Sequence, residues 1–132
     1  MRLFARASAC VCLGVVALVA RPAGQGAFLP IVDHVHLNVP DQAQAVAWYQ
    51  KNFAGQPMSE APDRLMFGDT RLIFLKNDHA QPSAGSAIDH IGFSFADLDA
   101  KMKEFEAAGV KVVTPVRDVQ GLFKLGFVED PW

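Results

Sequence analysis

The segment Val32–Asp41 reads V-D-H-V-H-L-N-V-P-D and alternates between two kinds of side chain. Successive side chains of a strand point to opposite faces, so His34, His36 and Asn38 share one face. The other face is apolar and should pack on a helix, because it carries Val35, Leu37 and Val39. The first face offers two imidazoles and an amide to whatever lies opposite.

The same phrase occurs a second time. Residues 88–97 read I-D-H-I-G-F-S-F-A-D, and His90 follows His34 at an offset of 56 residues. An amphipathic helix and then a glycine follow each copy, Gly55 in the first and Gly109 in the second. The histidines of two such units could be incidental. A histidine at the same repeat position favours a functional role, because imidazole is the commonest metal ligand.

The N-terminus is typical of an export signal. Arg2 and Arg6 precede an uncharged run over residues 7–20, which is too short for a comfortable membrane span. We expect residues 1–27 to be a cleaved signal peptide, with an uncleaved anchor as the alternative. The protein would then be exported, periplasmic or secreted, and free of the membrane after cleavage. Both cysteines lie inside the signal, so the mature protein would have no disulfide and would depend on its hydrophobic core for stability.

Composition limits the function classes. The chain has 132 residues, of which 51% are hydrophobic and 20% charged, as expected of one folded domain. Loss of residues 1–27 removes three arginines and no acid, which moves the net charge from −2 to −5. No basic cluster remains, so nucleic acid is excluded as a partner.

The remaining pattern predicts an α+β fold in a single domain, residues 28–132. Module one covers residues 31–77, a linker covers 78–86, and module two covers 87–132. In module one we expect a strand to Val39, a helix from Asp41 to Gly55, and strands at 57–61, 65–68 and 71–76. In module two we expect a strand at 87–95, a helix ending at Gly109, strands at 110–114 and 122–128, and a loop between them. A final strand is expected to be missing after Trp132.

The β-α-β-β-β order given twice, with D-H opening each copy and F-V-E-D-P-W near the end, resembles the vicinal oxygen chelate superfamily. That superfamily includes glyoxalase I, extradiol dioxygenases and bleomycin-binding proteins. The resemblance covers about residues 31–132. It implies two βαβββ modules that form a partly open, barrel-like sheet around a divalent metal and a small oxygen-chelating substrate.

The resemblance also implies which residues would hold the metal. His34 and His90 match the superfamily's histidine ligands, and the third ligand, a glutamate, is expected beyond Trp132. The further glutamate of glyoxalase I falls on Phe74, so a four-ligand site is not supported. Fe(II) or Mn(II) suits such a site, with Zn or Ni as further possibilities. His34 and His90 should approach each other within ~5 Å, the reach of two ligands on one metal.

Four further residues are expected to line the substrate pocket, namely Asn38, Phe74, Ser94 and Phe127. Alternation is expected to put Leu72 and Phe74 on the cavity side together with Phe123, Leu125 and Phe127. A mostly apolar wall favours a substrate of hydrophobic or aromatic character. His36 is a candidate catalytic acid-base group, although a partly solvated histidine without a role is an equal alternative.

Two functions compete at this stage. The first is a metal-dependent enzyme of dioxygenase, lyase or isomerase type acting on a small molecule. The alternative is a metal-free protein of the bleomycin-resistance kind that only sequesters its ligand. A homodimer is possible through the open sheet edge that a missing last strand would leave.

We predict that mature protein recovered from the cell envelope begins after about residue 27. The basic residues ahead of a short apolar run should direct export and cleavage. Intact-mass measurement of the envelope protein checks this, and an intact Met1 or purely cytosolic protein would contradict it.

Overall fold

The computed structural model describes residues 30–132, so the predicted signal at residues 1–27 lies outside the described part. Strand β1, His34–Val39, shows the expected alternation. Val39 is completely buried and Val35 and Leu37 are half-buried, whereas the side chains between them are exposed. β1 pairs in parallel with β4, Thr70–Lys76, so that its apolar face enters the core.

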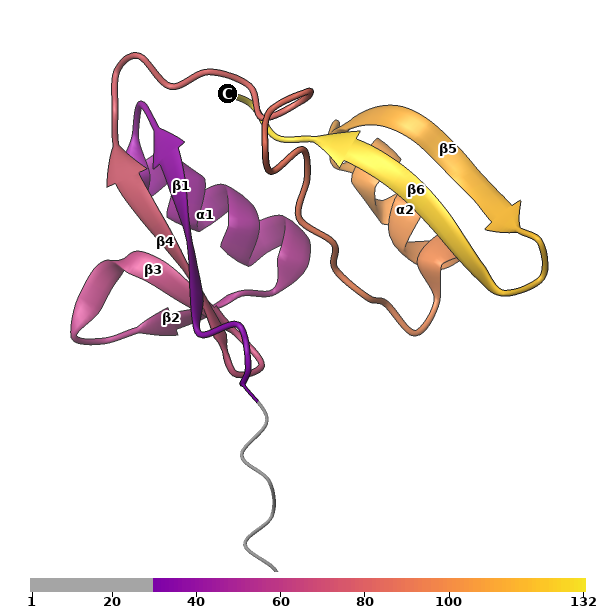
Figure 1. Ribbon diagram of the computed structural model, residues 1–132, viewed down its shortest axis with the longest axis horizontal. Coiled ribbons are helices and arrows are strands. Elements are labelled where there is room, and N and C mark those ends of the chain that lie inside the picture. The colour runs from indigo at the N-terminus through magenta and orange to yellow at the C-terminus, as the bar shows by residue number, and fades with distance from the viewer. Residues whose placement is uncertain (1–29) are drawn as a thin grey trace, which may run out of the picture. The chain divides into compact units, whose positions relative to one another are not determined.

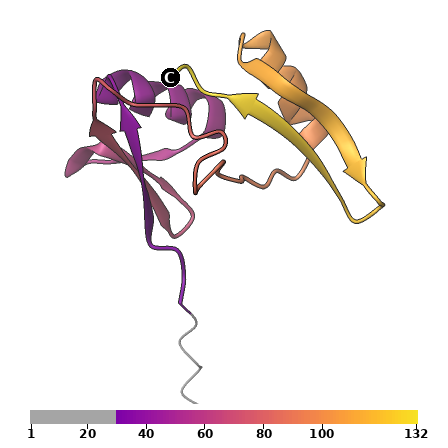
Figure 2. The ribbon, with the colours of Figure 1, turned by 45° about the horizontal axis from the view of Figure 1, so that its top comes forward.

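The first copy builds a four-stranded sheet in the order β1-β4-β3-β2. Strand β2 is Gln56–Met58, and β3 is Ala61–Phe67. Helix α1, Gln42–Phe53, covers one face of this sheet (Figures 1 and 2). The core between them contains Val39, Ala45, Tyr49, Leu65, Leu72 and Phe74.

Helix α1 begins as predicted and ends differently. The carboxylate of Asp41 accepts a hydrogen bond of 2.9 Å from the backbone N–H of Gln44, which caps the first turn. The left-handed residue at the end is Ala54, with φ of 56°, and not Gly55. A glycine is needed at position 55 for another reason. A Cβ there would lie 2.6 Å from Cζ of Phe67 and 2.8 Å from Cδ1 of Leu65.

The second copy contains helix α2, Leu98–Ala107, and the antiparallel strands β5, Lys111–Val119, and β6, Phe123–Glu129. Gly109, at which this helix was expected to end, follows α2 and is left-handed, with φ of 75°. β5 continues through Pro115, which was expected to begin a loop. The register shifts between Thr114 and Arg117, and this irregularity accommodates a residue that has no N–H for the ladder. Within residues 30–132, no helix is long and apolar enough to cross a membrane.

The expected strand over residues 87–95 does not form. These residues make no ladder in the structure and run as an irregular segment (Figure 1). The alternation itself persists, because Ile91 and Phe93 pack on the first core and Phe95 packs on the core of the second copy. In the first copy β4 supplies the hydrogen-bonding partner of β1. Among the described residues no strand after β6 supplies the equivalent partner, so the pattern alone does not make a strand. The α+β class is nevertheless confirmed, with open sheets.

The C-terminal residues contact helix α1 through a polar and an aromatic pair. The hydroxyl of Tyr49 donates a hydrogen bond of 2.9 Å to Oδ2 of Asp130. The ring of Trp132 meets the ring of Trp48 edge-on, with 6.2 Å between centroids. Burial raises the pKa of Asp130 above its usual value, and the Tyr49 hydrogen bond opposes that rise only partly. Burial likewise raises the pKa of Tyr49, so its hydroxyl keeps its proton.

Gly55→Ala should destabilise the protein by roughly 1–3 kcal/mol, because the added methyl overlaps Phe67 and the completely buried Leu65. Gly92→Ala is the matched control, since a Cβ there meets nothing within 4 Å. Chemical denaturation of both variants checks this. Equal stability of the two would contradict the tight packing at Gly55.

The Tyr49–Asp130 pair should make stability depend on pH. The pKa of Asp130 is higher in the folded than in the unfolded protein. The contribution of Asp130 to folding stability is therefore fully present below the unfolded pKa of about 3.8, and it is lost as pH rises through the folded pKa. Asp130→Asn keeps an acceptor for Tyr49 and removes the buried charge. This variant should therefore gain stability relative to the parent as pH rises from acid to neutral. Tyr49→Phe should lose about 1–2 kcal/mol at neutral pH and less in acid, because it leaves the carboxylate without its donor.

Thermal unfolding of the parent and the two variants across this pH range measures both effects. If the Asp130→Asn variant instead loses stability relative to the parent as pH rises, the ionised carboxylate stabilises the fold and the prediction is wrong.

Candidate functional site

The face of the four-stranded sheet opposite α1 carries most of the chemistry in the first copy. We call it the histidine face, formed by His34, His36, Asn38, Arg64, Met66, Arg71 and Ile73. Register puts these side chains in two rows across the strands. One row runs His34–Arg71–Met66 and the other His36–Ile73–Arg64. The two imidazoles lie side by side, with ring centroids 4.9 Å apart.

The histidine of β1 is oriented by the residue before it. Nδ1 of His34 lies 2.7 Å from Oδ2 of Asp33, and Arg71 forms an ion pair with the same carboxylate. The hydrogen bond to His34 and the ion pair with Arg71 lower the pKa of Asp33, so this carboxylate is ionised and only accepts. Nδ1 of His34 must then carry the proton, which leaves a lone pair on Nε2.

The second histidine repeats the arrangement. Nδ1 of His90 lies 3.1 Å from Oδ1 of Asp89. The backbone N–H of Gly85, and then His90, lower the pKa of Asp89, so that its carboxylate is also an acceptor. The ring of His90 meets Phe127 edge-on at 5.1 Å between centroids. In the neutral form, both histidines therefore carry a lone pair on Nε2, and within residues 30–132 neither Nε2 makes a hydrogen bond.

His36 has its own charged neighbours. Arg64 donates hydrogen bonds to both carboxylate oxygens of Asp63, at 2.9 and 3.2 Å. These bonds lower the pKa of Asp63, and His36 adds a smaller effect in the same direction. His36 therefore lies on the same face as Arg64, with Ile73 between them in the register, and it is exposed. Its expected acid-base role stays a prediction.

The metal site expected from the resemblance is incomplete in the described residues. Within 30–132, no three or more His, Cys, Asp or Glu side chains are gathered closely enough to hold a metal ion. His34 contacts the ring of His36 and His90 contacts that of Phe127, and no interaction in this part of the chain joins the two. The donor chemistry suits a metal, but these residues alone do not fit one. The approach of His34 to His90 stays a prediction.

The expected position of Phe74 is wrong. Phe74 is completely buried against Tyr49 in the core, on the face opposite the histidines, and its neighbour Leu72 shares that core. The β4 side chains on the same side of the sheet as the histidines are Arg71, Ile73 and Leu75, because they register with His34, His36 and Asn38. A carboxylate ligand from β4 would therefore have to stand at one of these positions, and none of them supplies it.

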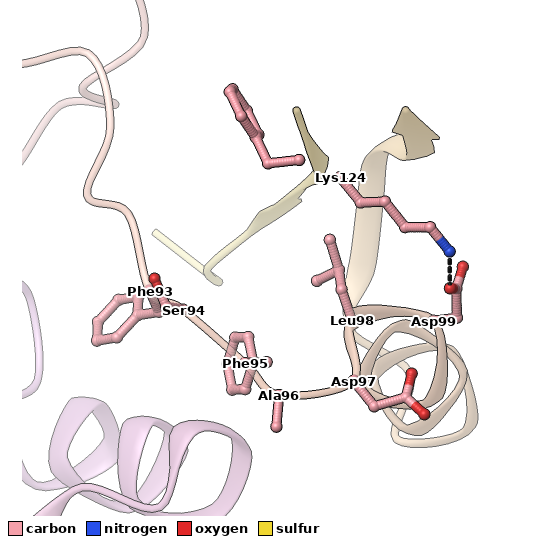
Figure 3. A pocket seen from close by; sticks show the side chains of 9 residues that line it. Phe93, Ser94, Phe95, Ala96, Asp97, Leu98, Asp99 and Lys124 are labelled. Atoms are coloured by element: carbon pink, nitrogen blue, oxygen red, sulfur yellow. Dashed lines mark hydrogen bonds and ion pairs between the residues drawn. The ribbon is translucent and has the colours of Figure 1, made fainter. Parts of the chain in front are cut away.

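The other expected pocket residues lie in different places. Asn38 is exposed on the histidine face. Ser94 lines a shallow pocket of about 660 Å³ between the segment 93–99 and the start of β6 (Figure 3). Lys124 forms an ion pair with Asp99 at the wall of that pocket, as Figure 3 shows. Phe127 shares its side of β6 with Phe123 and Leu125, as alternation predicts, while Gly126 contacts Met102 of α2 on the other side.

Sequence reasoning did not select Arg64 and Arg71. Their roles depend on which residues pair across β1, β4 and β3, and this register is not visible in any one segment. The only local signal is that both arginines interrupt apolar strands.

Comparisons with known proteins agree with this architecture. A solved structure described as "Crystal structure of SMU.1112c" matches with a TM-score of 0.55 and 24% sequence identity, over 78% of this chain and 92% of that chain. At this identity the likeness shows a shared fold. No curated protein is significantly similar to the chain. The family model of the Glyoxalase/Bleomycin resistance protein/Dioxygenase superfamily matches residues 31–132. This chain therefore belongs to that superfamily, the vicinal oxygen chelate group.

Proposed function

We propose that the protein is a metal-dependent enzyme of the vicinal oxygen chelate type acting on a small, oxygen-bearing molecule. The observation that carries the proposal is the pair of equivalent Asp–His units. In each, a carboxylate accepts a hydrogen bond from the Nδ1–H group of a neutral imidazole, so that the lone pair lies on Nε2. A carboxylate in this position fixes the tautomer of a metal-binding histidine and increases its basicity.

The repeat makes this arrangement hard to explain as chance. Asp33–His34 and Asp89–His90 occupy equivalent positions in two copies whose backbones differ, one in a strand and one in an irregular segment. The Asp–His hydrogen bond is present in both. A feature kept through a change of local structure is more consistent with a function of the histidines than with a demand of the strand.

The proposed ligands from this chain are His34 and His90, with Fe(II) or Mn(II) as the preferred ions. Two neutral imidazoles give no charge to offset a dication. The third ligand remains the glutamate expected beyond Trp132. In this proposal His36 and Asn38, beside His34 on the histidine face, hold the substrate, and His36 is the group able to exchange a proton with it.

A second candidate is a metal-free binding protein. It is favoured by the side chain at the β4 position beside His36, which is the apolar Ile73, and by the lack of a three-ligand group within residues 30–132. In this case the histidine face would bind its ligand by hydrogen bonds and apolar contact alone.

Metal titration distinguishes the two candidates. Mn(II) and Fe(II) are titrated into the present chain and into a version extended by a glutamate-bearing final strand. We expect the extended version to bind more tightly by more than about tenfold. His34→Ala and His90→Ala should each abolish the gain. His79→Ala is the matched control, because that histidine lies in the linker between the copies.

Two results would change the assignment. Equal affinity of the two lengths would mean that the third ligand already lies within residues 28–132, with Glu129 and His36 as the first candidates. Failure of both lengths to bind either ion would favour the metal-free binding protein.

A further inference from the structure

We propose that the histidine face recognises an anionic oxygen group, a carboxylate or its phosphonate analogue, on an otherwise apolar small molecule through Arg64 and Arg71. This rests on the proposed function in placing the ligand on that face, and it adds the chemical class of the ligand. The two arginines would be specificity-determining residues.

The histidine face combines cationic and apolar side chains, as a binding site for an amphiphilic acid would. Arg71 lies between His34 and Met66 in one row, and Ile73 lies between His36 and Arg64 in the other. Ile73 is only 8% exposed although it lies on the face opposite α1, and its neighbours in the register are His36 and Arg64. Ile73 and the half-buried Met66 form an apolar floor, with guanidinium and imidazole groups around it.

Both arginines are held in place by the sheet before any ligand arrives. The side chain of Arg71 is 34% exposed and that of Arg64 is 28% exposed, so much of each aliphatic stem is covered. Arg71 uses Nη2 on Asp33, and Arg64 uses Nε and Nη2 on Asp63. Nη1 of both arginines, and Nε of Arg71, make no hydrogen bond to residues 30–132. These N–H groups are available to an incoming oxygen anion in the fork geometry that guanidinium offers.

The alternative is that the arginines only form structural ion pairs. Partly exposed pairs of this kind stabilise a fold by little, at most about 1 kcal/mol. The carboxylates of Asp33 and Asp63 already accept from His34, Arg71 and Arg64, so the charged groups with unused hydrogen-bonding capacity on the face include guanidinium donors. An anion gains from such a surface, whereas a cation would have to compete with both arginines for the carboxylates.

The test is an NMR titration of the metal-free protein with benzoate, phenylphosphonate and the neutral analogue benzyl alcohol. Both anions should shift the backbone amides of β1, β3 and β4, and benzyl alcohol should bind at least about tenfold more weakly, as expected for loss of a charge-assisted hydrogen bond. The ratio of benzoate to phenylphosphonate affinity separates the two anion types. Equal binding of benzyl alcohol, or shifts confined to β5, β6 and α2, would overturn the proposal.

Variants test the residues directly. Arg64→Gln and Arg71→Gln should each weaken benzoate binding by about tenfold. Arg64→Lys and Arg71→Lys keep the positive charge and should retain part of the benzoate affinity. They replace the Gln variants in the test if a Gln variant does not fold. Asp63→Asn frees Arg64 from its internal partner and should strengthen binding, which a purely structural ion pair would not do. Arg117→Gln, on the exposed side of β5, removes the same charge elsewhere and should have no effect.

The result is independent of the metal question. The benzoate titration uses metal-free protein, and the Mn(II) titration is made without benzoate. Benzoate binding without metal binding would therefore preserve the anion site and contradict only the metal proposal. Metal binding with no effect of the arginine variants on benzoate would contradict only the anion site.

Discussion

The parallel pairing of β1 with β4 is the interaction on which the first copy depends. It hydrogen-bonds one edge of β1 along the length of the strand and fixes which side chains of the two strands share a face. The second copy of the same phrase is an internal control. Residues 88–95 keep the apolar alternation and bury Ile91, Phe93 and Phe95 partly, yet they form no strand. The alternation of apolar residues therefore determines which side chains point into the core. Whether the segment forms a strand depends on a neighbouring strand that can hydrogen-bond to it.

This distinction explains what the sequence could and could not predict of the fold. Features set by neighbours in the chain were correct, including the alternation in β1, the Asp41 cap and the end of the second helix before Gly109. Features set by distant residues were not. The end of α1 at Ala54 is followed by the close approach of Gly55 to Leu65 and Phe67, which both belong to β3. The continuation of β5 through Pro115 depends on β6, which tolerates a shifted register at that point.

The candidate site divides in the same way. The Asp–His hydrogen bonds join adjacent residues, so the repeated D-H pair was visible in the sequence. The neighbours of the histidines across the sheet were not visible, because a slip of one residue in register exchanges the two faces of a strand. That exchange accounts for the misplacement of Phe74 and for the failure to select Arg71. It also explains how the guanidinium of Arg71 comes to lie beside His34, although no motif in the sequence places the two together.

The contact between Trp48 and Trp132 gives the protein an optical property of its own. These are the two tryptophans of the chain, one in α1 and one at the C-terminal end, and their rings meet edge-on. Nε1 of Trp132 is buried without a hydrogen-bond partner in the described residues, so its indole sits in an apolar environment. Release of the C-terminal residues from α1 would transfer that indole to water and separate the two rings. Intrinsic fluorescence would therefore follow, without any label, whether the two copies of the repeat are joined through this contact.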